Sequence, residues 1–355
     1  GLEKYAASEI EELLKVKTKT EDSVVLFECT KEKLAYLCYK SQSLIKVCSL
    51  IEKIELNSVS DLKKIKTDFK KIIPKNKTFR VKFARMNSDF VSQEIEPALA
   101  DAMFEESSRE VDLENPDYVV YCYVCGNNAY IGIDYAGFDL GKRDYRIFAN
   151  PKSLHANISY ILLRIAGFEV GKSLIDPFCM SGETGIEAAL YLSGKSPYHF
   201  SKNKFAFSKF MKFNFDNVDK KAKSKIKGRI VLSSPKMSDV RAAQKNAKIA
   251  GVEKMIEFTR QDVEWLDLKI NKGAIDCLVS HIPCPSTNLT EKDLKRDYDD
   301  LFFQIKHVLS KKGKAVVMGK NLSYLKSLAK DVKLKEEIKF FNGKEPMEIA
   351  VFEKE

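Results

Sequence analysis

A loop with several groups that can bind a small charged ligand lies in the middle of the chain. It follows a strand pattern at 173–178, precedes a helix pattern at 185–192, and reads Asp176-Pro177-Phe178-Cys179-Met180-Ser181-Gly182-Glu183-Thr184-Gly185. Backbone amides at the start of a helix can bind a carboxylate or a phosphate. The carboxylate of Asp176 can accept hydrogen bonds from an ammonium group. The loop is therefore a candidate site for a ligand that carries both groups.

A second chemical feature is a mixture of basic and aromatic residues between 195 and 229. Eleven Lys or Arg stand there against two Asp, so most of the net charge of +10 comes from this segment. One interpretation is an RNA surface, where cations contact phosphates and rings stack on bases. The other is an insertion whose rings pack down while its lysines are only solvated. The residues in question include Tyr198, Phe200, Phe205, Phe207, Phe210, Phe213, Phe215, Lys220, Lys221 and Lys223.

The cysteines and the apolar runs bear on metal binding and on location. Among eight cysteines only Cys122 and Cys125 have metal-like spacing. They lie in a strand pattern that points their thiols to opposite faces, so we expect no metal site. Scattered cysteines in apolar segments predict reduced thiols. No run approaches the roughly 18 apolar residues of a membrane span, so a cytoplasmic protein without membrane contact is expected.

The first part of the chain alternates helix and strand patterns. Helices are expected at 5–14, 31–41, 61–73 and 88–103, and strands at 24–29, 44–54, 78–85, 118–125 and 129–137. The last two strands form a hairpin joined at Gly126, where a positive φ is favoured. In the strand 78–85, apolar residues face one side, which leaves Arg80, Lys82 and Arg85 available for RNA on the other. These patterns predict α+β folds.

From about residue 157 the pattern changes to apolar strands alternating with helices, which is typical of a doubly wound α/β sheet. Strands are expected at 173–178, 229–234, 255–262, 274–281 and 314–320, and helices at 185–192, 239–251 and 300–309. Ligands bind at the C-terminal ends of the strands of such a sheet. The polar segment 141–154 leads into this part, and its Lys142 and Arg143 are further candidates for RNA contact.

The loop at 176–185, followed by Ile186-Glu187-Ala188-Ala189, resembles the first motif of the THUMP-domain RNA guanine-N2 methyltransferases. The likeness extends to the first 14 residues, to the module near 60–145, to Tyr145-Arg146 with its following Pro-Lys-Ser-Leu, and to the aromatic-basic insertion. It implies a ferredoxin-like domain at 1–62, a THUMP domain at 63–146 and a Rossmann-fold methyltransferase domain at 147–355. It also implies S-adenosylmethionine as the cofactor.

The resemblance assigns cofactor contacts to the strand-end loops. They are Leu154, Asp176, Pro177, Cys179, Met180, Ser181, Gly182, Ser234, Asp262 and Val263. Family members have glycine where Met180 stands, and a positive φ there costs a non-glycine residue roughly 1–2 kcal/mol. They have an acidic residue for the ribose where Ser234 stands, and a serine can offer only a hydrogen bond without charge assistance. Asp262 matches the residue that accepts from the adenine amine.

The segment Ser280-His281-Ile282-Pro283-Cys284-Pro285 matches the family's catalytic motif. There, Asn or Asp followed by a residue, Pro and an aromatic accepts hydrogens from the guanine amine, while the aromatic ring stacks on a flipped base. Pro283 matches, His281 replaces the amide or acid, and Cys284 replaces the aromatic. A neutral imidazole can accept one hydrogen bond from the amine. The alternative for His281 is a structural role.

Two functions follow from the resemblance and from its departures. The first is an S-adenosylmethionine-dependent enzyme, expected to be monomeric, that methylates N2 of a guanosine in tRNA. A 23S ribosomal RNA guanosine is a second possible substrate, because the long insertion looks like that of the bacterial ribosomal branch. The altered positions favour a different function, a non-catalytic RNA-binding relative that has lost methyl transfer.

Overall fold

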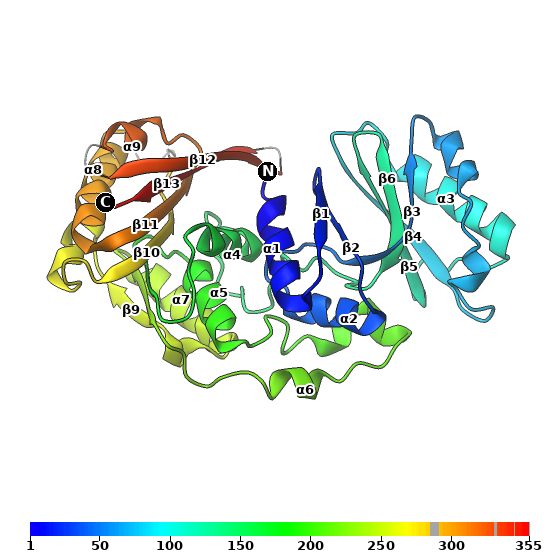
Figure 1. The fold of residues 1–355 in the computed structure, drawn as a ribbon, viewed down its shortest axis with the longest axis horizontal. Helices are drawn as coiled ribbons and strands as arrows, with labels where there is room; N and C mark the ends of the chain where they lie inside the picture. The colour runs from blue at the N-terminus through cyan, green and yellow to red at the C-terminus, as the bar shows by residue number, and fades with distance from the viewer. Residues whose placement is uncertain (285–290, 330–331, 344, 355) are drawn as a thin grey trace. The chain divides into compact units, whose positions relative to one another are not determined.

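The computed structural model describes residues 1–284, 291–329, 332–343 and 345–354, and the chain forms two compact units (Figure 1). Unit 1 comprises Gly1–Ala6, Gly141–His199 and Asp216–Glu355. Unit 2 comprises Ala7–Leu140 and Phe200–Phe215. The middle of the aromatic-basic insertion therefore belongs to unit 2, although the sequence on both sides of it belongs to unit 1. The predicted division of the N-terminal region at residue 62 stays a prediction.

Unit 1 is built on a seven-stranded sheet in the order β12-β13-β11-β10-β7-β8-β9. The five strands from β11 to β9 are parallel, whereas β13 runs antiparallel to β11 and β12 antiparallel to β13. This arrangement confirms the predicted doubly wound domain, and the β12–β13 hairpin is an addition that the sequence patterns did not predict. The strands are β7 (Ser173–Asp176), β8 (Arg229–Ser234), β9 (Glu257–Arg260), β10 (Ile275–His281), β11 (Leu309–Gly319), β12 (Lys333–Asn342) and β13 (Glu345–Glu353).

Helices cover both faces of this sheet. One buried cluster packs α4 (Ala156–Ile165), α5 (Glu183–Ser193) and α7 (Met237–Ile249) against one face, and another packs α8 (Glu291–Val308) and α9 (Ser323–Ser327) against the other (Figure 1). The chain reverses its direction of travel through the sheet between the neighbouring strands β7 and β10. A ligand crevice is expected at this point, outside the C-terminal ends of the two strands.

Unit 2 contains a four-stranded sheet in the order β3-β6-β5-β4, with α3 (Ser92–Ser107) against it (Figure 1). The predicted hairpin is confirmed, and Gly126 in its turn has a φ of 57°. The strands are β3 (Cys48–Glu55), β4 (Phe79–Met86), β5 (Tyr118–Cys125) and β6 (Asn128–Asp134). The N-terminal region adds the two-stranded sheet of β1 (Thr18–Glu21) and β2 (Val24–Phe27) and the helix α2 (Lys31–Lys40), while α1 (Glu3–Leu14) begins in unit 1.

The basic helix predicted at 61–73 does not form. Two short 3₁₀ helices, η1 (Val59–Lys64) and η2 (Phe69–Lys71), stand there instead. Between them, the backbone amide of Lys66 and the hydroxyl of Thr67 donate to the carboxylate of Glu52, at 3.2 and 2.7 Å. The peptide that would continue the helix is therefore held by a side chain of β3, which is a tertiary contact that a helical pattern cannot reveal.

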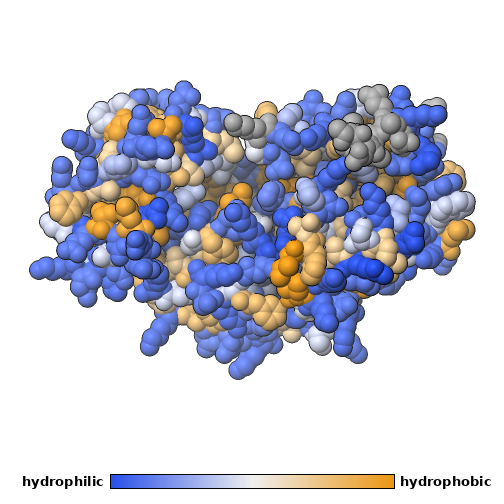
Figure 2. Space-filling model, turned by 180° about the vertical axis from the view of Figure 1, so that it is seen from behind, coloured by the Kyte–Doolittle hydropathy of each residue, from blue (hydrophilic) through white to orange (hydrophobic). Residues whose placement is uncertain are grey.

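Polar residues dominate the face of the molecule seen in Figure 2, where hydrophobic residues form small, separate patches. Among the described residues, no helix combines the length and apolar character that crossing a bilayer requires.

Candidate cofactor and catalytic site

The ligand loop begins where β7 ends, at Asp176. Its carboxylate is buried, and Oδ1 accepts hydrogen bonds from the hydroxyl of Ser280 at 2.6 Å and from the backbone amide of Phe178 at 3.1 Å. Burial raises the pKa of Asp176 to about 6, although these hydrogen bonds act in the opposite sense. At neutral pH a carboxylate with this pKa is ionised and poorly solvated, so it is well suited to accept from a ligand's ammonium group.

The loop has the backbone geometry that its sequence position requires. Met180 has a φ of 44°, the left-handed conformation in which a non-glycine residue costs roughly 1–2 kcal/mol. Gly182 has a φ of 89° and is the N-cap of α5. A Cβ on Gly182 would lie 2.7 Å from Cβ of Ala243, so only glycine lets α7 approach this closely. The amides at the start of α5 are thereby presented beside Asp176, as a bound carboxylate requires.

A segment that precedes α4 closes one side of the loop. The backbone amide of Asn150 donates to Oγ of Ser181 at 2.6 Å, and the hydroxyls of Ser153 and Ser181 are 2.5 Å apart. Asn246 of α7 donates from Nδ2 to the carbonyl oxygen of Ser181 at 3.0 Å. These bonds hold residues 150–153 against the ligand loop. Leu154, a predicted cofactor contact, is buried in the core cluster that anchors this segment.

A carboxylate that the sequence did not reveal lies at the end of β8. The hydroxyl of Ser234 donates to Oδ2 of Asp239 at 3.0 Å, and Nδ2 of Asn150 is 3.4 Å from Oδ1. Asp239 lies in the first turn of α7, where the helix dipole stabilises a negative charge. The sequence did not indicate a ligand-binding role for Asp239, because it stands five residues after Ser234 at a position where an acid commonly caps a helix. The helix turn brings its charge back to the strand end, where a ribose hydroxyl could use it.

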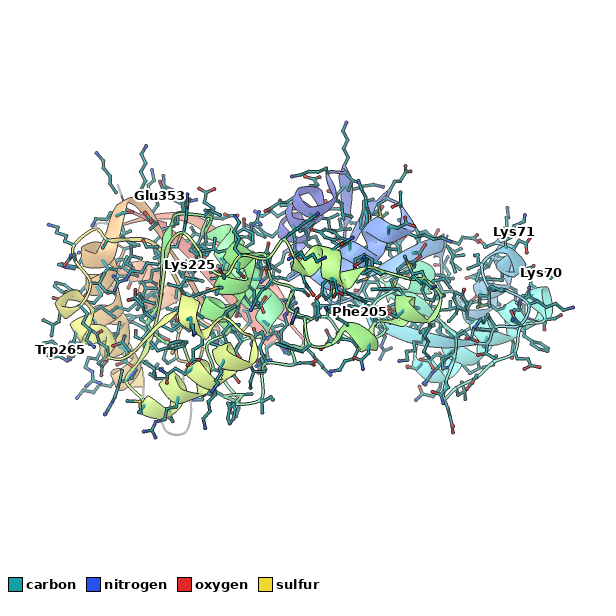
Figure 3. The ribbon with its side chains drawn as sticks, turned by 90° about the horizontal axis from the view of Figure 1, so that it is seen from below. Lys70, Lys71, Phe205, Lys225, Trp265 and Glu353 are labelled. Carbon is teal, nitrogen blue, oxygen red and sulfur yellow. The ribbon has the colours of Figure 1, made fainter. Side chains whose placement is uncertain are left out.

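The third predicted contact lies beside a surface hollow. Asp262 is exposed at the end of β9 and Val263 is buried beneath it. The hollow has a volume of about 360 Å³, and Trp265, which is 51% exposed, forms part of its wall at the periphery of unit 1 (Figure 3). Its lining is Pro235, Arg260, Gln261, Asp262, Trp265, Leu268 and Lys269. A hollow of this kind can hold a planar ring, and Asp262 at its wall can accept a hydrogen bond from an amine.

His281 ends β10, one residue after the serine that binds Asp176. Its Nδ1 is buried and has no hydrogen-bond partner within the part of the chain that the structure describes. Burial lowers the pKa of His281 below its usual value, the charge of Lys320 adds to this effect, and a hydrogen bond with the backbone of Lys152 opposes it. The ring is therefore neutral at pH 7, as an acceptor must be.

The rest of the candidate catalytic segment, which follows His281, is partly described. The hydroxyl of Tyr298 on α8 donates to the carbonyl oxygen of Pro283 at 2.6 Å, which holds the peptide between Pro283 and Cys284. The thiol of Cys284 is 3.7 Å from the carbonyl oxygen of Ile282. Pro285, the end of the motif, lies outside the described residues. Cys284 offers no ring, so a stacking contact with a base would have to come from another residue.

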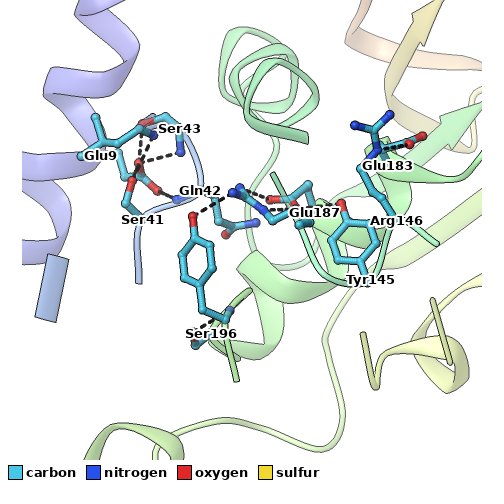
Figure 4. A network of polar contacts seen from close by, with 12 residues as sticks. Glu9, Ser41, Gln42, Ser43, Tyr145, Arg146, Glu183, Glu187 and Ser196 are labelled. Carbon is cyan, nitrogen blue, oxygen red and sulfur yellow. Dashed lines mark hydrogen bonds and ion pairs between the residues drawn. The ribbon is translucent and has the colours of Figure 1, made fainter. Parts of the chain in front are cut away.

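The structure corrects the assignment of Arg143 to RNA binding. Its guanidinium is buried and forms two hydrogen bonds with the carboxylate of Glu187, from Nε at 3.0 Å and from Nη2 at 3.1 Å. Nη1 donates to the hydroxyl of Tyr198 at 2.8 Å, and the hydroxyl of Tyr145 donates to Glu187 at 2.8 Å (Figure 4). A guanidinium enclosed in this way cannot reach a phosphate. Arg143 instead forms a structural ion pair with Glu187 inside unit 1.

Most aromatic rings of the insertion at 195–229 pack against other rings of the protein, as the second of the two interpretations of this segment predicts. Phe205, labelled in Figure 3, and Phe207 are buried and stacked, with ring centroids 5.1 Å apart. Phe210 stacks on Tyr118 of β5, with ring centroids 4.9 Å apart. Phe205 and Phe207 are thus core residues of unit 2 and cannot stack on bases, while Phe210 is half-buried and already stacked on a protein ring. Phe200, which is 70% exposed, is the exception.

The remaining predicted RNA contacts differ in their exposure. Lys142, Lys220, Lys221 and Lys223 are exposed. On β4, Lys82 is half-buried, Nη1 of Arg80 donates to the carbonyl oxygen of Leu113 at 2.8 Å, and Arg85 is exposed and bonded to the carbonyl oxygen of Phe90. Among the described residues, no three His, Cys, Asp or Glu are placed to hold a metal ion together.

The fold and the strand-end loops define unit 1 as a class I methyltransferase domain. A family model described as an RMKL-like methyltransferase domain, UPF0020, matches residues 143–349, and a THUMP domain model matches residues 63–134. The chain therefore belongs to the UPF0020 family, and its methyltransferase domain follows a THUMP domain. Both domains confirm what the resemblance implied. S-adenosylmethionine is the cofactor of this class, and the acceptors, amides and hollow described above fit it.

Several curated proteins are similar along much of the chain. The tRNA (guanine(6)-N2)-methyltransferase of Methanocaldococcus jannaschii is 27% identical over 336 residues, which cover 90% of this chain and 88% of the relative. The enzyme of the same name from Archaeoglobus fulgidus is 28% identical over 80% of this chain and 71% of the relative. The ribosomal RNA large subunit methyltransferase K/L of Buchnera aphidicola is 29% identical over 74% of this chain but only 40% of the relative.

Solved structures share the fold. A putative methyltransferase complexed with SAH has a TM-score of 0.83 at 19% identity, and the match covers 100% of this chain and 96% of that one. TrmN from Thermus thermophilus has a TM-score of 0.74 at 19% identity, with 100% and 97% covered.

Proposed function

We propose that this chain is an S-adenosylmethionine-dependent RNA methyltransferase that modifies N2 of a guanosine in tRNA. The observation that carries the proposal is the hydrogen bond of 2.6 Å from Ser280 to Asp176. It joins the proposed ammonium acceptor at the end of β7 to the strand end that bears His281, so a cofactor bound at Asp176 and an amine bound at His281 would lie side by side. The relatives that cover most of the chain are named as tRNA guanine-N2 methyltransferases, which favours tRNA over ribosomal RNA.

The chain's own groups have distinct tasks in this reaction. Asp176 and the amides of α5 orient the amino acid end of the cofactor, Asp239 with Ser234 holds its ribose, and Asp262 accepts from its adenine. The cofactor supplies an electrophilic methyl group when it is bound. Neutral His281 accepts a hydrogen from the guanine amine, which directs the nitrogen lone pair toward the methyl carbon and provides a place for the proton that the product amine releases. We also propose that the enzyme acts as a monomer in the cytoplasm.

The histidine provides a direct test. His281→Ala should lower turnover by about a hundredfold, because the amine loses its acceptor, while RNA binding should change little. His281→Asn restores an acceptor and should retain activity. The measurement is incorporation of tritiated methyl groups into total tRNA and, separately, into ribosomal RNA, with His307→Ala as a control that removes a histidine of α8. Undiminished transfer in His281→Ala would remove the imidazole from the mechanism, and label in ribosomal RNA alone would overturn the substrate.

The ribose contact gives a second test. Asp239→Asn should weaken binding of S-adenosylhomocysteine by about tenfold, because a charge-assisted hydrogen bond is lost. Ser234→Ala should weaken it less, because the hydroxyl's role here is to hold the carboxylate. Isothermal titration of the full chain measures both. A larger loss in Ser234→Ala than in Asp239→Asn would show that the serine itself holds the ribose.

A non-catalytic RNA-binding protein is the second candidate. It is favoured by the side chain of Met180 in the left-handed position and by the absence of a ring at Cys284. Under this hypothesis the parent transfers no methyl group, and activity appears only when Met180→Gly, Ser234→Asp, His281→Asn and Cys284→Tyr are combined. Activity in the parent excludes it.

A further inference from the structure

A lysine stands next to the catalytic segment without a role in the mechanism above. Lys320 follows the last residue of β11, which runs parallel to β10. Met318 of β11 is paired with His281 of β10. The amide of Ile282 donates to the carbonyl oxygen of Met318 at 3.0 Å, and a Cβ on Gly319 would lie 3.3 Å from the side chain of Ile282. The backbone that leads into Lys320 therefore packs directly against the segment 281–284.

Among the residues that the structure describes, Glu345 is the partner of the ammonium group of Lys320. Nζ lies 2.9 Å from Oε1 of Glu345, the first residue of β13, and the two side chains are 50% and 59% exposed. The bond to Glu345 raises the pKa of Lys320. The charge of Lys320 adds to the effect of burial in lowering the pKa of His281, so it acts at the candidate catalytic segment. An exposed ion pair of this kind contributes little to stability, so the ammonium can exchange Glu345 for another anion at little cost.

The anion available at this edge is a phosphate of the substrate. A guanosine that is paired in a helix can place its amine at His281 only after it has flipped out, and contacts to the neighbouring phosphates can then position it. A cation in contact with the amine itself would oppose the positive charge that develops on the attacking nitrogen. A phosphate contact carries no such penalty.

We propose that Lys320 binds an RNA phosphate next to the target guanosine and that Glu345 occupies the ammonium until RNA replaces it. The inference rests on the proposed function, since it places the target guanosine at His281. It makes Lys320 a substrate-binding residue and Glu345 a competitor of the RNA backbone. The two substitutions should therefore have opposite effects on RNA affinity.

The test compares RNA binding by the full chain without cofactor. Fluorescence anisotropy with a tRNA transcript, repeated over a series of KCl concentrations, measures the affinity and its salt dependence for the parent and for Lys320→Gln, Lys320→Arg and Glu345→Gln. Lys320→Gln should weaken binding by about tenfold and lower the logarithmic salt slope by about 0.9 if the contacted strand is part of a duplex. Lys320→Arg keeps the positive charge and should retain the RNA affinity and the salt slope of the parent. Glu345→Gln should tighten binding, because the competitor is gone.

A matched control is Lys311→Gln, which removes the same charge from the opposite end of β11. Equal losses in Lys311→Gln and Lys320→Gln would show only general charge attraction and would overturn the proposal, as would weaker binding by Glu345→Gln. Failure of the proposed function would look different. A parent that binds RNA but transfers no methyl group would overturn the activity, whereas normal transfer with unchanged RNA affinity in Lys320→Gln would overturn only the role of Lys320.

Discussion

Asp176→Asn should stabilise the free protein and weaken its binding of S-adenosylmethionine. Burial raises the pKa of the carboxyl to about 6 in the folded chain, well above the usual value near 4. A raised pKa means that this group's contribution to stability is complete below about pH 4 and is lost as the pH rises through 6. At pH 8 the buried carboxylate thus costs up to about 3 kcal/mol, which a neutral amide avoids. Thermal unfolding without cofactor measures the gain.

Cofactor binding should respond in the opposite direction. The amide cannot supply the negative charge that an ammonium group seeks, so Asp176→Asn should raise the dissociation constant by about tenfold to a hundredfold. Below pH 6 the carboxyl of Asp176 in the parent is protonated and must lose its proton when the cofactor binds. The dissociation constant should therefore rise about tenfold for each pH unit below 6. In Asp176→Asn this pH dependence should vanish.

Asp89→Asn, which changes an exposed carboxyl of unit 2, serves as the control for both measurements. It should alter neither the unfolding temperature nor cofactor affinity. If Asp176→Asn bound the cofactor as tightly as the parent at pH 8, the carboxylate would not be the ammonium acceptor, and the assignment of the crevice between β7 and β10 would have to change.

Arg143→Ala should destabilise unit 1 by about 3–5 kcal/mol, because it leaves the fully buried carboxylate of Glu187 without its partner. For a unit of this size, such a loss lowers the unfolding temperature by roughly 10 °C. Thermal unfolding followed by circular dichroism measures it. Lys142→Ala, which truncates the exposed neighbour, should change stability by less than about 0.5 kcal/mol.

A second substitution separates the ion pair from simple loss of packing. Arg143→Met combined with Glu187→Leu replaces both charges by apolar groups of similar size and should recover most of the stability lost in Arg143→Ala. If Arg143→Ala instead left the unfolding temperature unchanged and weakened RNA binding, the side chain would act at the surface and its structural role would be excluded.

The sequence alone was sufficient for the parts of this protein that depend on short-range pattern. Alternating apolar strands and helices predicted the doubly wound sheet, and the strand ends then located the ligand loop, Asp262 and His281. The turn residues predicted the hairpin at Gly126. These features can be predicted because a strand's burial pattern and a loop's backbone geometry depend on neighbouring residues.

The tertiary structure decided what depends on partners distant in sequence. A basic, polar linker residue such as Arg143 looks exposed until Glu187 and Tyr198 enclose it. Phe205 and Phe207 alternate with lysines like an RNA surface, yet their rings pack on other rings in unit 2. Asp239 looks like a helix cap until α7 places it beside Ser234. In each case the chemistry of the side chain was visible in the sequence, but its burial and its partners were set by folding, because charge and aromaticity suit both a nucleic acid and a protein interior.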